Sequence, residues 1–197
     1  MLVKYNFFNQ ELFLMTTRRN LLKALVGTSA ITLLPNKVFS FNFFKNTGDI
    51  RKIRLMNSNT GENVNTIYWI EGNYVQEALD QINYFMRDWR QNKIINYDTN
   101  NLDIISATQA LLDTEEPFEL LSGYRTKKTN KMLSKHTVGV ARNSYHTKGM
   151  AADLRMKTRS VNQIARAAES FRSGGVGRYN NSHFVHIDSG RRRLWSQ

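Results

Sequence analysis

The spacing of apolar residues changes along this chain, and the change limits the folds that it can adopt. Polar and apolar residues alternate over Arg51–Met56, and the chain is strand-like again over Val64–Ile70, with turn-forming residues between the two runs. This pattern predicts a β-hairpin. Over Val75–Trp89, apolar residues recur at spacings of three and four, which indicates an amphipathic helix. The chain therefore has to bury strands and helices against a common core.

The rest of the chain shows further runs with the strand-like and the helix-like spacing of apolar residues. Helices are predicted over Leu102–Leu112, near Lys128–Leu133 and over Val161–Phe171, and strands over Phe118–Leu121, Gly149–Met156 and His183–Asp188. A glycine-rich turn, Gly174–Gly177, is expected to lead into the last strand. Arg191–Arg193 is expected to be a solvated terminus, and Trp195 a packing residue. The predicted fold class is α+β, with helices packed on a small, mainly antiparallel sheet.

The first 40 residues are typical of an export signal. Arg18 and Arg19 stand directly before an apolar stretch, residues 24–34, and cleavage is expected after the small residue Ser40. Paired arginines in this position resemble a twin-arginine signal peptide. The apolar stretch is shorter than the roughly 20 residues that span a membrane. An amphipathic or buried helix is the alternative interpretation.

We therefore divide the chain into a signal peptide, residues 1–40, and one mature domain, residues 41–197, whose length suits a single core. Met15 offers an alternative start, because the residues before it add nothing that a signal needs. This division predicts export to the periplasm or cell wall by the twin-arginine machinery, with no stable membrane anchor after cleavage.

The chain is strongly basic. It has 28 Lys and Arg against 16 Asp and Glu, a formal charge of +12. Residues 1–40 hold five basic residues and one acidic residue, so the remainder carries 23 minus 15, or +8. Such an excess favours polyanionic partners, either nucleic acid or an anionic envelope surface. The basic residues are scattered, and the export signal and the lack of a recognisable nucleic-acid-binding fold argue against nucleic acid.

No cysteine occurs in the chain, which excludes thiol nucleophiles, thiolate ligands and disulfides. Any metal must therefore be bound through nitrogen and oxygen. All four histidines lie between His136 and His186. His146 on a loop, Asp153 on a strand and His186 on a second strand can converge if the two strands are adjacent. Zinc in hydrolytic sites takes three such ligands. The alternative is that these histidines only satisfy hydrogen bonds in loops or the core.

Three ordered motifs extend this pattern: Ser122–Thr126, Ser144–Asp153 and Phe184–Gly190. Together they resemble the M15 family of zinc peptidases, and within it the DUF882 group, which includes murein endopeptidases. The resemblance runs from about Arg51 to Trp195. It implies the fold of the M15 D-Ala-D-Ala peptidases, one zinc ion per chain, and cleavage of peptide cross-links of peptidoglycan during cell-wall remodelling.

The resemblance also implies roles for single residues. His146, Asp153 and His186 fall on the family's zinc-ligand positions. Arg125, in the Ser-Gly-Tyr-Arg motif, is expected to face the substrate, the stem peptides of peptidoglycan. A guanidinium there can bind a peptide carboxylate or polarise the scissile carbonyl. A D,D- or L,D-carboxypeptidase and a non-catalytic wall-binding module are the alternatives to an endopeptidase.

The general base departs from the family pattern. Relatives often have a Glu three residues before the last ligand or a catalytic His two residues before it, whereas this chain has His183 and Phe184 there. His183 is a candidate because imidazoles titrate near neutrality, although strand alternation places it on the face opposite His186. Asp188 shares the face of His186 and can support that ligand or act as the base itself. A role in ending the strand is the alternative for Asp188. The expected catalytic residues are thus His183, Asp188 and Arg125.

Overall fold

The computed structural model describes residues 50–136 and 140–197. All described residues belong to one compact unit. The predicted signal peptide, residues 1–40, lies outside the described residues. Among the helices that the structure describes, none has the length and apolar character needed to cross a membrane.

The described residues form a series of strands and helices that starts with the predicted hairpin. In chain order the elements are β1 (Ile50–Asn57), β2 (Asn63–Ile70), β3 (Asn73–Tyr74), α2 (Gln76–Phe85), α3 (Thr99–Leu111), β4 (Phe118–Ser122), α4 (Lys127–His136), the 3-10 helix η3 (Tyr145–Lys148), β5 (Ala151–Arg155), α5 (Val161–Glu169), β6 (Gly175–Tyr179), β7 (Phe184–Asp188) and β8 (Arg193–Ser196). The hairpin and the predicted helices are confirmed, with shifts at their ends.

The strands belong to one eight-stranded sheet with the order β3-β2-β1-β4-β5-β7-β6-β8. Only two neighbouring pairs, β1 with β4 and β6 with β8, are parallel, and the other pairs are antiparallel. The predicted α+β class with a mainly antiparallel sheet is confirmed. The sheet is larger than predicted, because the sequence pattern did not reveal β3, β6 and β8.

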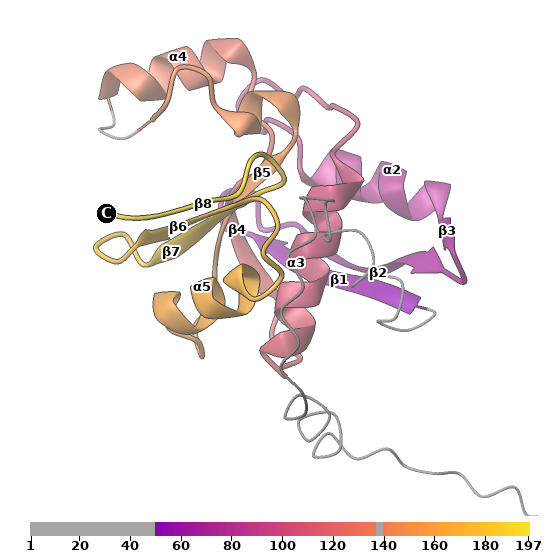
Figure 1. The fold of residues 1–197 in the computed structure, drawn as a ribbon. Helices are drawn as coiled ribbons and strands as arrows, with labels where there is room; N and C mark the ends of the chain where they lie inside the picture. The colour runs from indigo at the N-terminus through magenta and orange to yellow at the C-terminus, as the bar shows by residue number, and fades with distance from the viewer. Residues whose placement is uncertain (1–49, 137–139) are drawn as a thin grey trace, which may run out of the picture. The chain divides into compact units, whose positions relative to one another are not determined.

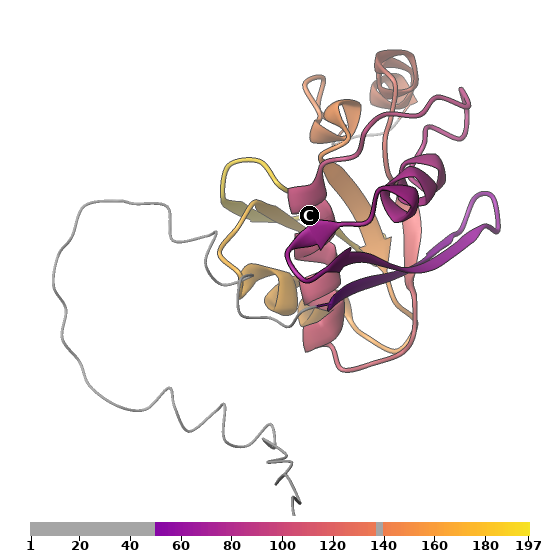
Figure 2. The same ribbon diagram turned by 90° about the vertical axis from the view of Figure 1, so that its right-hand side faces the viewer.

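Helices α3 and α5 pack on one face of the sheet, α3 against β1 and β7, and α5 against β6 and β7 (Figures 1 and 2). Alternation along the strands decides which side chains each face receives. Leu154 of β5 and Val185 of β7 belong to the core and are 0% exposed. Their neighbours Asp153 and His186 therefore point to the opposite face, where residues of α4 and η3 line the same cleft; α4 is seen on that side of the sheet in Figure 1.

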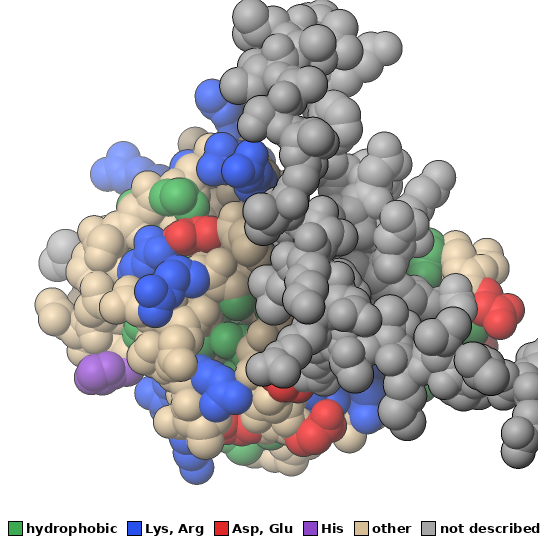
Figure 3. Space-filling view, turned by 60° about the horizontal axis from the view of Figure 1, so that its bottom comes forward, with side chains coloured by type: hydrophobic (Ala, Val, Ile, Leu, Met, Phe, Trp, Pro, Cys, Tyr) green, Lys and Arg blue, Asp and Glu red, His purple; other side chains and the backbone are tan. Residues whose placement is uncertain are grey.

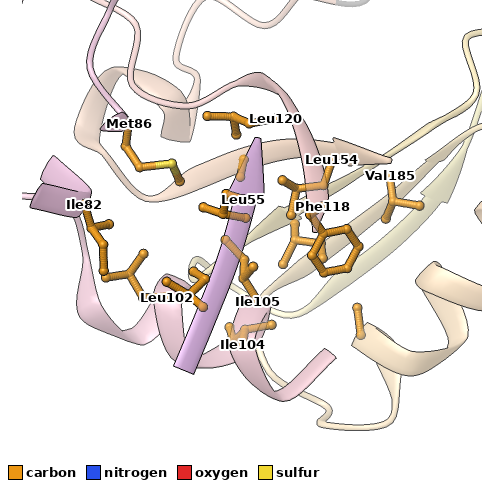
Figure 4. Packing of buried hydrophobic residues seen from close by; sticks show 14 of the residues in the cluster. Leu55, Ile82, Met86, Leu102, Ile104, Ile105, Phe118, Leu120, Leu154 and Val185 are labelled. Carbon is orange, nitrogen blue, oxygen red and sulfur yellow. The ribbon is translucent and has the colours of Figure 1, made fainter. Parts of the chain in front are cut away.

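One hydrophobic core joins the helices to the sheet. Figure 4 shows Leu102 and Ile105 of α3 beside Leu55 of β1, with Phe118 of β4 nearby, and none of the four is more than 1% exposed. Burying a side chain of this size stabilises the fold by about 1.5–3 kcal/mol. The core thus fixes the strand register, on which the positions of the polar residues on the other face depend.

Helix α2 ends at Phe85, before the predicted end at Trp89. The buried carboxylate of Asp88 explains the difference, because it accepts hydrogen bonds from the backbone NH groups of Arg90 and Gln91. Such local hydrogen bonds replace those of a continuing helix. The apolar period persists to Trp89, but the backbone leaves the helix first.

Helix α3 begins at Thr99, before the predicted start at Leu102. The side chain of Asp98 accepts a hydrogen bond of 2.9 Å from the backbone NH of Asn101, which is an N-cap. The backbone NH of Asp98 also donates to the carbonyl oxygen of Gly149, at 2.9 Å. The start of α3 is therefore tied to the loop that precedes β5.

The C-terminal part departs from the predictions in two places. Only Gly174 has a left-handed backbone, with φ of 70°, whereas Gly175 already begins β6. The predicted glycine turn is therefore mostly strand. Arg191, Arg192 and Arg193 are exposed as predicted, but Arg193 also begins β8, an unpredicted strand that pairs with β6 in parallel.

Charged side chains are spread over the part of the surface that Figure 3 shows. In Figure 3, Lys and Arg side chains are distributed over the visible face, with Asp and Glu between them. This arrangement agrees with the scattered basic residues of the sequence. On the face shown, the positive charge forms no single block of the kind that typifies nucleic-acid-binding surfaces.

Candidate metal centre

Strand pairing brings Asp153 and His186 together. The two residues are directly opposite each other in the antiparallel pair of β5 and β7, where facing side chains have Cβ atoms about 4.5–5.5 Å apart. Asp153 Oδ1 and His186 Nδ1 are 2.9 Å apart, although the residues are 33 positions apart in the chain. The two strands are thus adjacent, which is the condition for these residues to converge.

His146 comes from a short loop element whose ends are well defined. It lies in η3, where the N-cap residue Ser144 accepts a hydrogen bond of 3.3 Å from the backbone NH of His146. The C-cap residue Gly149 has φ of 68°, a backbone conformation that favours glycine. This loop places His146 Nε2 3.2 Å from Asp153 Oδ1 and 3.3 Å from His186 Nδ1.

The other ring nitrogen of each histidine faces an acceptor. His146 Nδ1 lies 2.7 Å from the carbonyl oxygen of Gly123, and His186 Nε2 lies 2.9 Å from Asp188 Oδ2. Because a carbonyl or carboxylate oxygen only accepts, these outer nitrogens are the ones that carry the ring hydrogens in the tautomer that a metal ion would select. In the neutral rings, His146 Nε2 and His186 Nδ1 then have lone pairs.

Three electron-pair donors thus converge, His146 Nε2, Asp153 Oδ1 and His186 Nδ1, all within 4.8 Å of one another. With both rings neutral, the two lone pairs face the Asp153 oxygen, and either a proton on one ring or a cation between the three atoms is needed to offset their repulsion. A tetrahedral zinc ion with ligands at about 2.0–2.2 Å needs ligand atoms roughly 3.3–3.6 Å apart. The observed separations of 3.2, 3.3 and 2.9 Å are close to this. The donor set therefore fits a small divalent cation.

The pKa shifts reflect the same arrangement. Burial lowers the pKa of His146. Burial alone would raise the pKa of Asp153, but the charges and hydrogen bonds of the two histidines hold it well below its usual range. For His186, burial acts to lower the pKa, but the hydrogen bonds and charges of Asp153 and Asp188 raise it to about 9. In the absence of a metal, a proton on His186 supplies the positive charge, and a bound cation would displace it.

Arg125 lies against the same group of residues. Its backbone NH donates to the carbonyl oxygen of His146 at 3.1 Å, and its Nη2 lies 3.4 Å from Ser144 Oγ. The residue is 9% exposed, and its Nε has no hydrogen-bond partner within the described part of the chain. Burial lowers the pKa of the guanidinium, and the charge of Asp153 opposes this. A buried donor without a partner suits an oxygen atom of a ligand.

Asp188 is 0% exposed and lies behind His186. Its carboxylate accepts hydrogen bonds from the backbone NH groups of Gly175 and Gly190, at 3.2 and 2.9 Å, and forms an ion pair of 2.7 Å with Arg193. Burial would raise the pKa of Asp188, but the hydrogen bonds and charges around it lower the pKa below its usual range. The carboxylate is thus fully engaged on the side of His186 away from the three donor atoms.

The structure does not bring His183 to this site. His183 is exposed, has φ of 53° and precedes β7. It lines a separate cavity of about 490 Å³ together with Glu119 and Arg155. Strand alternation from His186 had placed it on the opposite face, and no irregularity of the strand reverses this. The predicted catalytic role of His183 has no support in this geometry.

The three donor residues lie in a cleft of about 1130 Å³. Among the described residues that line it, Asp153 is the only one with an acidic side chain, whereas four are arginines. Three of these, Arg191, Arg192 and Arg193, belong to the C-terminal segment. The electrostatic character of the cleft therefore suits a ligand with negative charges.

The C-terminal strand is the part of the site that sequence reasoning missed. Arg193 and Trp195 line the cleft, although they were expected to be a solvated terminus and a packing residue. The sequence feature that could have indicated this strand is the pair of glycines Gly175 and Gly177. Glycines inside a strand often mark a place where other atoms approach the backbone closely.

Comparison with known proteins agrees with the motifs and the geometry. Residues 45–195 match the family model Peptidase_M15_2, described as peptidoglycan L,D-endopeptidase MepK. The peptidoglycan L,D-endopeptidase MepK of Escherichia coli (strain K12) is 41% identical over 179 residues, which are 90% of this chain and 96% of that protein. The protein named probable peptidoglycan L,D-endopeptidase MepK in Haemophilus influenzae is 35% identical over 166 residues, which are 84% of this chain and 88% of that protein. The chain is therefore a member of the Peptidase_M15_2 family, one of the M15 peptidase families that its three sequence motifs resemble.

Proposed function

We propose that the protein is a zinc-dependent endopeptidase that cleaves peptide cross-links of peptidoglycan during cell-wall remodelling. The observation that carries the proposal is the convergence of His146 Nε2, Asp153 Oδ1 and His186 Nδ1 in a cleft. Membership of the peptidase family supports the reaction class. Because the relatives are named L,D-endopeptidases, we infer that this chain acts on the same kind of cross-link.

In this proposal, His146, Asp153 and His186 hold one zinc ion per chain. Two imidazoles and a carboxylate form a nitrogen and oxygen donor set that zinc accepts, and three protein ligands are typical of its catalytic sites. When bound, zinc polarises a carbonyl group and lowers the pKa of water to near neutrality. Gly123 and Asp188 keep the hydrogens of the two rings on the outer nitrogens, so that the inner nitrogens are free to act as ligands.

We assign Asp188 the role of orienting His186, and not that of general base. Its carboxylate is completely buried and contacts the ring on the side away from Asp153. A general base has to reach the proton that it removes within about 2.6–3.2 Å or through one water. Asp188 reaches the cleft only through His186, so its effect on catalysis is indirect.

Arg125 binds the substrate in this proposal. Its Nε has no partner among the described residues, and its guanidinium lies next to Ser144 at the wall of the cleft. A fixed donor of this kind stabilises the negative charge that develops on a carbonyl oxygen during hydrolysis.

The test is cleavage of purified cross-linked muropeptides by the purified protein with zinc, with the products identified by mass. We expect L,D-cross-linked dimers to become monomers, and His186→Ala to form no product because one of three ligands is missing. Loss of a terminal alanine from stem peptides while the cross-links stay intact would make the protein a carboxypeptidase. Binding of muropeptides without formation of any product would indicate the remaining alternative, a non-catalytic wall-binding module.

We also propose that residues 1–40 export the protein by the twin-arginine route, so that it acts outside the cytoplasm. The paired Arg18 and Arg19 support this, because a receptor reads the pair itself and not only its charge. Replacing both with lysine should retain the precursor in the cytoplasm, whereas Lys23→Arg serves as a control that leaves the pair intact. Cell fractionation and immunoblotting measure the outcome. Normal export of the double variant would indicate a general secretory signal instead.

A further inference from the structure

Strand β6 lies between β7 and β8, and its register places residues of the three strands in rows across the sheet. Gly175 of β6 is opposite Asp188 of β7 and opposite Arg193 of β8. In the next row, Gly177 is opposite His186 and Trp195. On the face of the sheet that carries the donor atoms, side chains of β8 thus have to pass over β6 to reach β7.

The two glycines leave the space for this. A Cβ atom at position 175 would lie 2.6 Å from Asp188 Oδ2 and 2.7 Å from Arg193 Nη1. At Gly177, a Cβ atom would overlap the indole ring of Trp195. Neither glycine has a left-handed backbone, so its conformation does not require glycine. Glycine is required at these positions because side chains from β8 pass close to the backbone of β6.

Above Gly175 of β6, Arg193 binds the carboxylate of Asp188 through two of its nitrogen atoms. Its Nη2 lies 2.7 Å from Asp188 Oδ2 and its Nη1 lies 3.1 Å from Oδ1. A fork of two parallel hydrogen bonds fixes the plane of a carboxylate as well as its position. Oδ2 is also the atom that receives the hydrogen bond from His186 Nε2, at 2.9 Å. The guanidinium therefore sets the direction of the oxygen that holds the ring of His186.

Aromatic rings hold the guanidinium in turn. The Arg193 guanidinium carbon lies 4.9 Å from the ring centre of Tyr145 and 5.0 Å from that of Trp195. The Trp195 ring lies 5.3 Å from the ring of His186, and its Nε1 donates to the hydroxyl of Tyr179 at 3.2 Å. Such cation–π contacts restrict a side chain that would otherwise be mobile.

We propose that Arg193 is a positioning residue of the metal centre, which acts through Asp188 on His186, and that β8 is thereby part of the site. The inference rests on the proposed metal site. Removing Arg193 leaves Asp188 buried, with backbone NH groups and His186 as its remaining partners. The carboxylate is then free to rotate, and the orientation of His186 is less well defined. Loss of such an outer contact typically weakens metal affinity by about 10–100-fold.

The chain offers a matched control. Arg191 and Arg192 line the same cleft and are exposed, but no hydrogen bond or ion pair joins their side chains to the rest of the described chain. The experiment measures the zinc dissociation constant by chelator competition for the purified full chain, Arg193→Ala, Arg193→Lys and Arg191→Ala. We expect about 10–100-fold weaker zinc binding for Arg193→Ala, a smaller loss for Arg193→Lys, which keeps the charge but not the fork, and no change for Arg191→Ala.

Two further measurements distinguish positioning from a general effect on folding. In the metal-free state, the thermal midpoint reports stability alone, so a purely structural role would lower it without changing zinc affinity. Gly175→Ala, which places a methyl group between the two side chains, should weaken zinc binding in the same way as Arg193→Ala. Combining Arg193→Ala with Asp188→Asn should weaken it no further than Asp188→Asn alone, because the two residues act in one chain of contacts.

The outcomes separate this inference from the proposed function. Unchanged zinc affinity in Arg193→Ala, with weaker binding in Asp188→Asn, would overturn the role of Arg193 and leave the metal site in place. An equal loss in Arg191→Ala would also overturn it, because the effect would then be one of overall charge. If the unmodified protein bound no zinc at all, the metal site itself would be wrong.

Discussion

Two carboxylates in this molecule, the buried Asp103 and the partly buried Asp153, have opposite surroundings. Asp103 of α3 faces three donors: Arg51 Nη1 at 2.6 Å, the Tyr68 hydroxyl at 2.9 Å and the Tyr74 hydroxyl at 3.1 Å. Each donor comes from a different strand of the hairpin side of the sheet. Burial, followed by the charge of Asp103, raises the pKa of Tyr68 well above its usual value, so this hydroxyl keeps its hydrogen. The cluster is complete without any further component.

Asp153 faces ring nitrogen atoms of His146 and His186, whose other ring nitrogens each have an acceptor of their own. When both rings are neutral with their hydrogens on those outer nitrogens, the Asp153 oxygen meets lone pairs where Asp103 meets hydrogens, and a proton on His186 or a cation has to supply the missing charge. A buried carboxylate with enough donors joins parts of a fold, whereas one that faces other acceptors requires a proton or a cation. The structural cluster at Asp103 and the candidate metal site at Asp153 thus differ in the atoms that face the carboxylate.

The largest effect is expected from Asp153→Asn. The amide keeps the size of the side chain and can donate a hydrogen bond to a histidine nitrogen, so the lone pairs are satisfied without a cation. We expect zinc to be lost and cleavage to fall to background, while the metal-free protein is at least as stable as the unmodified one. Zinc content, muropeptide cleavage and thermal midpoint in the presence of a chelator measure the three results. Stoichiometric zinc in this variant would show that Asp153 is not a ligand.

Asp103→Ala should give the reverse pattern. Removing one partner from a buried ion pair typically lowers stability by about 3–5 kcal/mol, which is a large share of the total for a domain. We expect a loss of this order in urea unfolding, and stoichiometric zinc in the fraction that folds. Tyr74→Phe, which removes one of the donors and leaves the carboxylate, should have a smaller effect. Loss of zinc from folded Asp103→Ala would mean that the two clusters are coupled.

Arg125→Ala tests a residue that lies beside the metal ligands without belonging to them. Removing one fixed donor at a developing oxyanion lowers kcat by about 10²–10³-fold, or roughly 2.7–4 kcal/mol. We expect a loss of this size in single-turnover cleavage, with unchanged zinc content, because Arg125 contacts His146 only through its backbone NH. Arg125→Lys keeps the charge and should recover only part of the rate. A variant with full activity would remove Arg125 from the substrate site.

For the central part of the site, the sequence offered short periods and three motifs that resemble the M15 family. Alternation along β5 and β7 is a local property, and it puts Asp153 and His186 on the face opposite α3 and α5 once the strands pair. The loop position of His146 also followed from its spacing to Asp153. What the sequence pattern could not provide was the pairing itself, which depends on how the whole sheet assembles.

The strands β6 and β8 could not be predicted, for a physical reason. Gly175 and Gly177 have little strand propensity of their own, and they are in a strand because β7 and β8 pair with it on either side. Arg193 looks like any charged residue near a terminus, and its partner Asp188 belongs to another strand. Such a contact depends on tertiary structure alone, so the local spacing of apolar and polar residues does not predict it.

The smallest effect is expected from His183, which the sequence offers as a candidate general base. Alternation placed it on the face away from His186, and the structure puts it beside a different cavity with a left-handed backbone. Asparagine tolerates that backbone conformation, so His183→Asn tests the side chain without adding strain. We expect unchanged zinc content and cleavage rate, and a change in stability within about 0.5 kcal/mol, as for other surface positions. A positioned general base would instead lose about 10²–10⁴-fold in rate. A loss of that size would mean that the turn between β6 and β7 rearranges to bring His183 over the edge of the sheet when substrate binds.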